Sequence, residues 1–158
     1  MVNGVSHAAH LSIGSNLGDR ARQCYAAVGM LSRHSQIQIT AVSDLLETAP
    51  IGGPADAAPY LNGAMSINTT LGPTALMDAL LSIETAVGRV RQTKWEPRVI
   101  DLDLLLYADQ IFSSDDLMIP HPLLHQRRFV LEPLNQIAPG VVHPILLMNI
   151  SDLLDRLK

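Results

Sequence analysis

The fold is indicated first by a stretch that reads VIDLDLLLY between residues 99 and 107. Successive side chains of a β-strand point to opposite faces of the sheet. The stretch is therefore expected to carry Asp101 and Asp103 on one face and an aliphatic set on the other, namely Leu102, Leu104 and Leu106. Such a strand buries its leucine face in a core and leaves two carboxylates on the opposite face.

Strands and helices are predicted to alternate before this stretch. Alternating apolar residues predict strands at 7–13, from 37 toward 46, and at 60–71. Apolar residues at helical spacing predict a helix over 21–31 and a second one that begins at Gly72-Pro73 and ends at Gly88. The segments 48–59 and 88–97 are expected to be loops.

Beyond residue 107, a hairpin that leads through Phe112 to Ile119 is predicted first, and a largely helical finish begins at Pro120. The hairpin is expected at Ala108-Asp109, followed by helices at 129–137 and 150–157. Because hairpin-type connections join neighbouring strands, the whole pattern favours an α+β fold with a mainly antiparallel sheet.

Length and composition favour one ordered domain over residues 1–158. Hydrophobic residues make up 47% of the chain and charged residues 16%, close to ordinary globular usage. A net charge of −4 disfavours nucleic-acid and membrane partners, which need a basic surface. Cys24 is the only cysteine, so neither a disulfide nor a cysteine zinc site can form within the chain. With no secretory signal and no long apolar run, we expect a soluble cytoplasmic protein.

The two aspartates are candidates for a metal site. Carboxylates about 7 Å apart on a partly buried sheet face repel one another unless a cation compensates them. Magnesium fits, because it is commonly bound by one or two carboxylates together with water and phosphate oxygens. From spacing alone, a solvated sheet edge with two exposed aspartates explains Asp101 and Asp103 equally well.

Basic residues gather around this pair, and none lies between His34 and Gly88. Six of the eleven in the chain are Arg89, Arg91, Lys94, Arg98, Arg127 and Arg128. One guanidinium group can donate two parallel hydrogen bonds to the oxygens of a phosphate, so a polyphosphate ligand is indicated. The alternative is a solvated charged loop, which would also be rich in arginine. The glycine-rich phosphate loop and the three-glycine dinucleotide motif are both missing from the sequence. His121 and His125 are four residues apart, but Pro122 between them and the lack of a third ligand disfavour zinc.

A longer series of motifs carries a resemblance to a known family. The series begins with IGSNLG at 13–18, TAP at 48–50 and YLN at 60–62, and continues with GRVR at 88–91, Trp95 and PRVIDLD at 97–103. It ends with IPHP at 119–122 and EPL at 132–134. Between residues 10 and 144 the chain resembles 6-hydroxymethyl-7,8-dihydropterin pyrophosphokinase, a family of folate-pathway enzymes.

The resemblance implies a ferredoxin-like α/β sandwich, expected as a monomer, and a specific reaction. ATP would give its β,γ-pyrophosphoryl group to the hydroxymethyl oxygen of the pterin and leave as AMP. Asp101 and Asp103 would hold two Mg²⁺ ions, with Arg89 and Arg98 as further catalytic residues. The ATP phosphates would be faced by Arg89, Arg91, Arg98, His121 and Arg127, and Glu84 would lie near the nucleotide.

The same resemblance implies a pterin site. The pterin ring would stack between Tyr60 and Phe129. Its polar edge would be contacted by Asn62 and by the backbone of Thr48, Ala49 and Ile51. Trp95 would close over the ring. Without the resemblance, both aromatic residues could be core residues, Asn62 a turn residue, and Glu84 the partner of Arg91 on a helix surface. Two other functions stay open at this point: an ordinary γ-phosphoryl kinase, and a silent nucleotide-binding module.

Overall fold

The computed structural model describes residues 4–48, 59–88 and 99–157. A central antiparallel sheet has the strand order β2-β4-β1-β5, and β3 lies beside β4 as a fifth strand. The strands are β1 (His7–Ser15), β2 (Ile37–Val42), β3 (Leu46–Thr48), β4 (Tyr60–Thr69) and β5 (Asp101–Tyr107). The expected α+β class with a mainly antiparallel sheet is confirmed.

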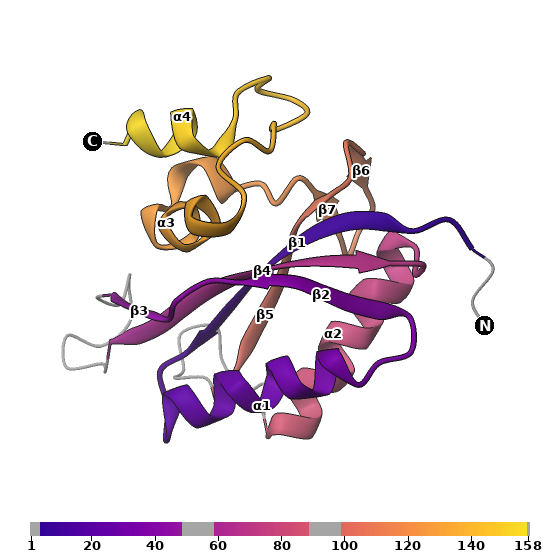
Figure 1. Cartoon of the computed structure of the whole chain (residues 1–158), viewed down its shortest axis with the longest axis vertical. Helices are drawn as coiled ribbons and strands as arrows, with labels where there is room; N and C mark the ends of the chain where they lie inside the picture. The colour runs from indigo at the N-terminus through magenta and orange to yellow at the C-terminus, as the bar shows by residue number, and fades with distance from the viewer. Residues whose placement is uncertain (1–3, 49–58, 89–98, 158) are drawn as a thin grey trace.

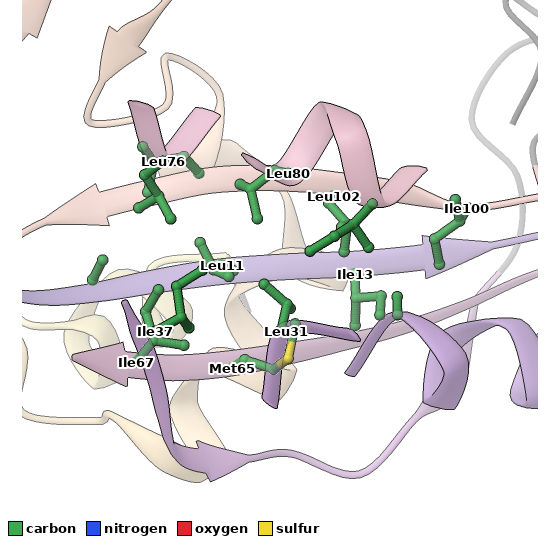
Figure 2. Packing of buried hydrophobic residues seen from close by; sticks show 14 of the residues in the cluster. Leu11, Ile13, Leu31, Ile37, Met65, Ile67, Leu76, Leu80, Ile100 and Leu102 are labelled. Atoms are coloured by element: carbon green, nitrogen blue, oxygen red, sulfur yellow. The ribbon is translucent and has the colours of Figure 1, made fainter. Parts of the chain in front are cut away.

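Two long helices, α1 (Arg20–Ser32) and α2 (Pro73–Val87), cover one face of the sheet (Figure 1). The side chain of Asp19 caps α1 by accepting from the backbone N–H of Arg22. Gly72 and Pro73 open α2 as the sequence predicts, and Gly88 ends it at a φ of 121°, a conformation open to glycine. Figure 2 shows the apolar side chains of these helices meeting those of the strands, including Leu11, Leu31, Leu80 and Leu102.

The C-terminal helices α3 (Arg128–Ile137) and α4 (Ile150–Asp155) lie on the opposite face (Figure 1). They bury a separate apolar cluster that takes only three residues from the strands, Ala64, Leu105 and Leu106. Pro133 is buried inside α3 and does not interrupt it. This face of the sheet is therefore only partly covered with aliphatic residues, and the remainder carries polar side chains.

One part of the prediction for β5 is wrong. Leu102 and Leu104 lie in the cluster under α1 and α2 as expected, but Leu106 lies in the cluster under α3 and α4. The pairing of β1 with β5 shifts by one residue: His10 pairs with Leu106, and the next residue, Leu11, pairs with Leu104, so Leu105 has no partner on β1. This bulge at Leu105 reverses the side-chain alternation, which a strict period of two could not anticipate.

The hairpin expected at Ala108-Asp109 is a turn that does not join paired strands. Gln110 N–H donates to Tyr107 C=O at 3.0 Å, but the next strand, β6 (Phe112–Ser113), pairs with β7 (Met118–Ile119). The strand expected from 37 toward 46 is likewise divided into β2 and β3, both of which pair with β4. A short 3-10 helix, η1 (Leu124–Gln126), then leads into α3. Within the described ranges, no helix has the length and apolar character that crossing a bilayer requires.

Candidate active site

The antiparallel register brings predicted site residues into one row across the sheet. Asn62 on β4 pairs with Gly14 on β1, and Gly14 pairs with Asp101 on β5. Residues directly opposite one another in adjacent strands share a face, so Asn62 and Asp101 lie on the same face, roughly 10 Å apart across two strand spacings. In the next row, Ser12 lies between Asp103 and Ala64. Ala64 belongs to the cluster under α3 and α4, which identifies the face.

Gly14 leaves the middle of this row without a side chain. A Cβ placed there would come within 3.0 Å of Asn62 Oδ1 and 3.7 Å of Tyr60 Cδ1. The carbonyl oxygen of Asn62 therefore lies over β1, on the side toward Asp101. The amide nitrogen of the same side chain donates to Thr48 Oγ1 on the other side of β4. Asn62 is 8% exposed and lies within a strand, so the alternative of a turn residue is wrong.

Asp101 and Asp103 are half-buried at the start of β5, on the polar face, as their spacing predicts. In the described part of the chain, no group of three or more His, Cys, Asp and Glu residues gathers as a metal site. The candidate donor set among the described residues is the pair of carboxylates on β5, Asp101 and Asp103. This set fits magnesium, which accepts one or two carboxylates and takes its other ligands from water and phosphate oxygens.

His121 follows the β7 strand and is anchored to β5. Its backbone N–H donates to Leu105 C=O at 2.9 Å, directly after the cis peptide bond between Ile119 and Pro120. Burial lowers the pKa of His121 below its ordinary value, the charge of Arg127 lowers it further, and the charge of Asp101 opposes both. Three predicted site residues from separate segments, Asp101, His121 and Arg127, are therefore near enough to influence one another electrostatically.

The aromatic candidates occupy two borders of the polar face. Tyr60 pairs with Thr48 across β4 and β3 and is half-buried. Phe129 lies in the first turn of α3, where the guanidinium carbon of Arg127 is 5.6 Å from its ring centroid. Phe129 also packs partly against the cluster under α3 and α4, so it combines a packing role with an accessible edge.

Glu84 is buried rather than on the surface of α2. It is 2% exposed, and its Oε2 accepts a hydrogen bond from Leu102 N–H at 2.7 Å. The side chain therefore reaches the backbone of β5 between the two aspartates, and it does not lie on the helix surface, while the alternative partner Arg91 lies outside the described residues. Six predicted site residues lie outside the described residues: Ala49, Ile51, Arg89, Arg91, Trp95 and Arg98.

Two residues that the sequence did not single out hold the segments around the site. Gln23 Nε2 lies 3.0 Å from Ser15 Oγ and 3.2 Å from Val99 C=O, so α1 is linked to the end of β1 and the start of β5. Arg20 Nη1 donates to Pro59 C=O at 2.7 Å, next to the start of β4. Arg20 directly follows the cap residue Asp19 and Gln23 lies one turn after it, but no spacing rule identifies their distant partners.

The comparison with protein families agrees with this geometry. A family model described as 7,8-dihydro-6-hydroxymethylpterin-pyrophosphokinase matches residues 10–139, which include every described site residue. The chain belongs to this pyrophosphokinase family. The resemblance inferred from the motifs is thereby confirmed, and the chain is an enzyme of the pyrophosphokinase type.

Individual relatives support the same family. A 2-amino-4-hydroxy-6-hydroxymethyldihydropteridine pyrophosphokinase from Bacillus subtilis is 39% identical over 87% of this chain and 81% of its own length. One of the same name from Methylorubrum extorquens is 43% identical over 85% of this chain and 84% of its own. A crystal structure of Plasmodium falciparum HPPK-DHPS with pteroate has a TM-score of 0.78 at 15% identity, which shows a shared fold. This chain covers 43% of that longer protein.

Proposed function

We propose that the reaction takes place on the polar face of the sheet, over β1 between Asn62 and Asp101. There, the β,γ-pyrophosphoryl group of ATP passes to the hydroxymethyl group of 6-hydroxymethyl-7,8-dihydropterin, with AMP as the second product, as a step of folate biosynthesis. One observation carries the proposal: the row of Asn62, Gly14 and Asp101 places a polar amide and a carboxylate on either side of a residue without a side chain. Both substrates can therefore approach the sheet closely.

Asp101 and Asp103 would hold magnesium, with two ions expected from the family resemblance. Bound there, the metal would neutralise phosphate oxygens and stabilise the charge that develops on the departing AMP as its bond to the β-phosphate breaks. The two carboxylates lie at the beginning of the same strand and on the same face of the sheet, so both can bind metal ions on one side of a polyphosphate. Arg89, Arg91 and Arg98 are proposed as the cationic partners of the phosphates, by resemblance.

His121 and Arg127 would act on the phosphates from the α3 side. Because burial and the neighbouring Arg127 lower the pKa of His121, its ring is neutral near pH 7 and serves first as a hydrogen-bonding group. Phosphate oxygens beside the ring would raise that pKa, so nucleotide binding and protonation of His121 should be coupled.

Asn62 would orient the pterin. Its amide nitrogen donates a hydrogen bond to Thr48 Oγ1, and its carbonyl oxygen is directed over Gly14. An oxygen held in this way accepts hydrogen bonds from the amino and ring N–H groups of a pterin. Tyr60 and Phe129 are proposed to stack on the ring, with Thr48, Ala49, Ile51 and Trp95 as further contacts.

We also propose that the enzyme acts as a monomer in the cytoplasm, as one domain and without nucleic-acid or membrane partners. The net charge of −4 and the single, buried Cys24 support this. Burial raises the pKa of the Cys24 thiol to about 11, so the thiol is unreactive near neutral pH.

Identification of the nucleotide product tests the reaction. The purified protein is incubated with Mg²⁺, ATP and the reduced pterin, and the products are separated by chromatography. The expected result is AMP together with the pterin diphosphate in equal amounts. ADP with a pterin monophosphate would instead establish a γ-phosphoryl kinase, and binding of both substrates without turnover would establish a nucleotide-binding module.

A further inference from the structure

The strand that carries the aspartates lies at the edge of the central sheet. In the described sheet, β5 pairs with β1 on one side and with no strand on the other. The N–H groups of an edge strand that point outward lack a ladder partner. Leu102 is the residue between Asp101 and Asp103, and its N–H donates to Glu84 Oε2 at 2.7 Å instead of to a strand. A side chain of α2 thus occupies the open edge at the metal-binding position.

This arrangement holds three consecutive residues of β5 from two sides. In an antiparallel pair, successive residues direct their backbone groups alternately toward and away from the neighbouring strand. Because Leu102 points away from β1, Asp101 and Asp103 point their backbone groups toward Gly14 and Ser12, which are their partners on β1. The inner side of the strand is therefore held by β1 and the outer side by Glu84.

Glu84 is itself firmly placed. It is 2% exposed and lies one turn after Leu80, which is fully buried in the cluster under α1 and α2. Its backbone C=O accepts from Gly88 N–H at 3.2 Å, so the same residue also takes part in ending α2. A buried acceptor on a packed helix end can fix a strand edge more tightly than a solvated side chain could.

We propose that Glu84 is a positioning residue, which sets the relative placement of the Asp101 and Asp103 carboxylates by holding the backbone of Leu102 at the open edge of β5. This role rests on the proposed metal site. It differs from the direct nucleotide contact that the family resemblance implies, because Glu84 acts through the strand. Shifting Leu102 outward would turn both neighbouring carboxylates away from a common metal.

Two substitutions of Glu84 distinguish the effect of its side-chain length from the effect of its negative charge. Glu84→Gln keeps the length of the side chain and an oxygen that can accept from Leu102 N–H, but removes the negative charge. Glu84→Asp keeps the charge and shortens the side chain by one methylene, so the oxygen no longer reaches Leu102. A positioning role predicts that the Gln variant is nearly normal and that the Asp variant is impaired. Leu80→Ala, one turn earlier in α2, serves as the control for lost packing.

Mn²⁺ binding and amide exchange are the measurements. Mn²⁺ is titrated by electron paramagnetic resonance in the presence of an ATP analogue that resists hydrolysis, and hydrogen exchange of the Leu102 amide is followed by NMR. We expect Glu84→Asp to weaken Mn²⁺ binding about 10-fold and to accelerate exchange at Leu102 selectively, whereas Glu84→Gln stays within about 3-fold of the unmodified protein. Leu80→Ala should accelerate core exchange generally and leave Mn²⁺ affinity unchanged.

Three outcomes would overturn the proposal. A Gln variant weaker than the Asp variant would show that charge, not reach, matters. Unchanged Mn²⁺ binding and Leu102 exchange in Glu84→Asp, with a raised KM for ATP, would show a direct nucleotide contact. If the unmodified protein binds no Mn²⁺ with the nucleotide, the metal site itself fails and the positioning role fails with it, while amide exchange still reports separately whether Glu84 holds Leu102.

Discussion

The two faces of the central sheet differ in what covers them. Under α1 and α2, the strands contribute a continuous aliphatic surface that includes Leu11, Met65 and Leu102. Under α3 and α4, aliphatic contact is limited to Ala64, Leu105 and Leu106. The rest of this second face carries Asn62, Gly14, Ser12 and the two aspartates. The same strands therefore build a core on one side and a largely polar surface on the other.

Because side chains alternate between the two faces, residues on one face are expected to affect mainly stability, and residues on the other face mainly activity. A residue on the aliphatic face is enclosed on all sides, so its loss is felt as a cavity. A residue on the polar face borders space that the substrates would fill, so its loss is felt in binding or turnover. Substitutions at adjacent positions of one strand should therefore have opposite consequences.

The largest expected effect is on turnover when the two proposed metal ligands are neutralised. Asp101→Asn or Asp103→Asn keeps the shape of the side chain and removes the charge, so turnover should fall by at least about 100-fold. The thermal unfolding midpoint should stay near that of the unmodified protein. Steady-state assays at several Mg²⁺ concentrations and a thermal melt check both parts. Near-normal turnover of either variant at low Mg²⁺ would contradict the metal assignment.

A substitution on the aliphatic face should lower stability and leave activity nearly unchanged. Leu11→Ala removes a fully buried side chain of β1 and should lower the free energy of unfolding by about 2–5 kcal/mol. Activity per folded molecule should remain close to normal below the melting transition. Urea unfolding measured together with active-site titration tests this expectation. A large loss of activity in fully folded Leu11→Ala would show that the two faces are not independent.

Two glycines in adjacent strands provide a matched pair. Gly14→Ala would place a Cβ 3.0 Å from Asn62 Oδ1 on the polar face, and Gly63→Ala would place one 2.9 Å from Leu45 Cδ2 and 3.3 Å from Ile13 Cγ2 on the other. Gly14→Ala should raise the KM for the pterin about 10-fold, equivalent to about 1.4 kcal/mol of lost binding. Gly63→Ala should mainly lower the melting temperature. Equal effects on KM would contradict the assignment of the polar face.

The smallest expected effect concerns acid stability. Burial lowers the pKa of His10 and His143 below the ordinary value of 6.5, so the folded protein resists protonation that the unfolded chain accepts. The free energy of unfolding should therefore be highest above pH 6.5 and fall as the pH decreases toward the folded pKa values. Urea unfolding at pH 7.5 and pH 5.5 measures the fall.

His10→Gln provides the control for this titration. Glutamine can keep a hydrogen bond to Ser66 Oγ, which His10 Nδ1 meets at 2.9 Å, but it does not titrate. The difference between the two pH values should become smaller in this variant. An unchanged or larger pH dependence would show that His10 does not contribute.

Much of this arrangement could be predicted from the sequence. The alternation in residues 101–104 placed Asp101 and Asp103 correctly opposite Leu102 and Leu104, and proline and glycine marked both ends of α2. The family motifs led to the right enzyme family, because short ordered motifs are far more specific than periodicity.

Other features depend on long-range pairing and could not be predicted. The bulge that moves Leu106 to the other face exists only because β1 and β5 pair with a shifted register. The hydrogen bond from Leu102 to Glu84 requires the packing of α2 against a strand edge. Neither leaves a local signal in the residues themselves, whereas the row of Asn62, Gly14 and Asp101 becomes evident as soon as the register is known.

The location of the site is tested most directly by a crystal structure of the protein with Mg²⁺, an ATP analogue that resists hydrolysis and 6-hydroxymethylpterin. The account predicts metal density at the Asp101 and Asp103 carboxylates, phosphates beside His121 and Arg127, and the pterin over Gly14 with a polar contact to Asn62. Metal or nucleotide bound away from the two aspartates, or a pterin bound on the face covered by α1 and α2, would contradict it.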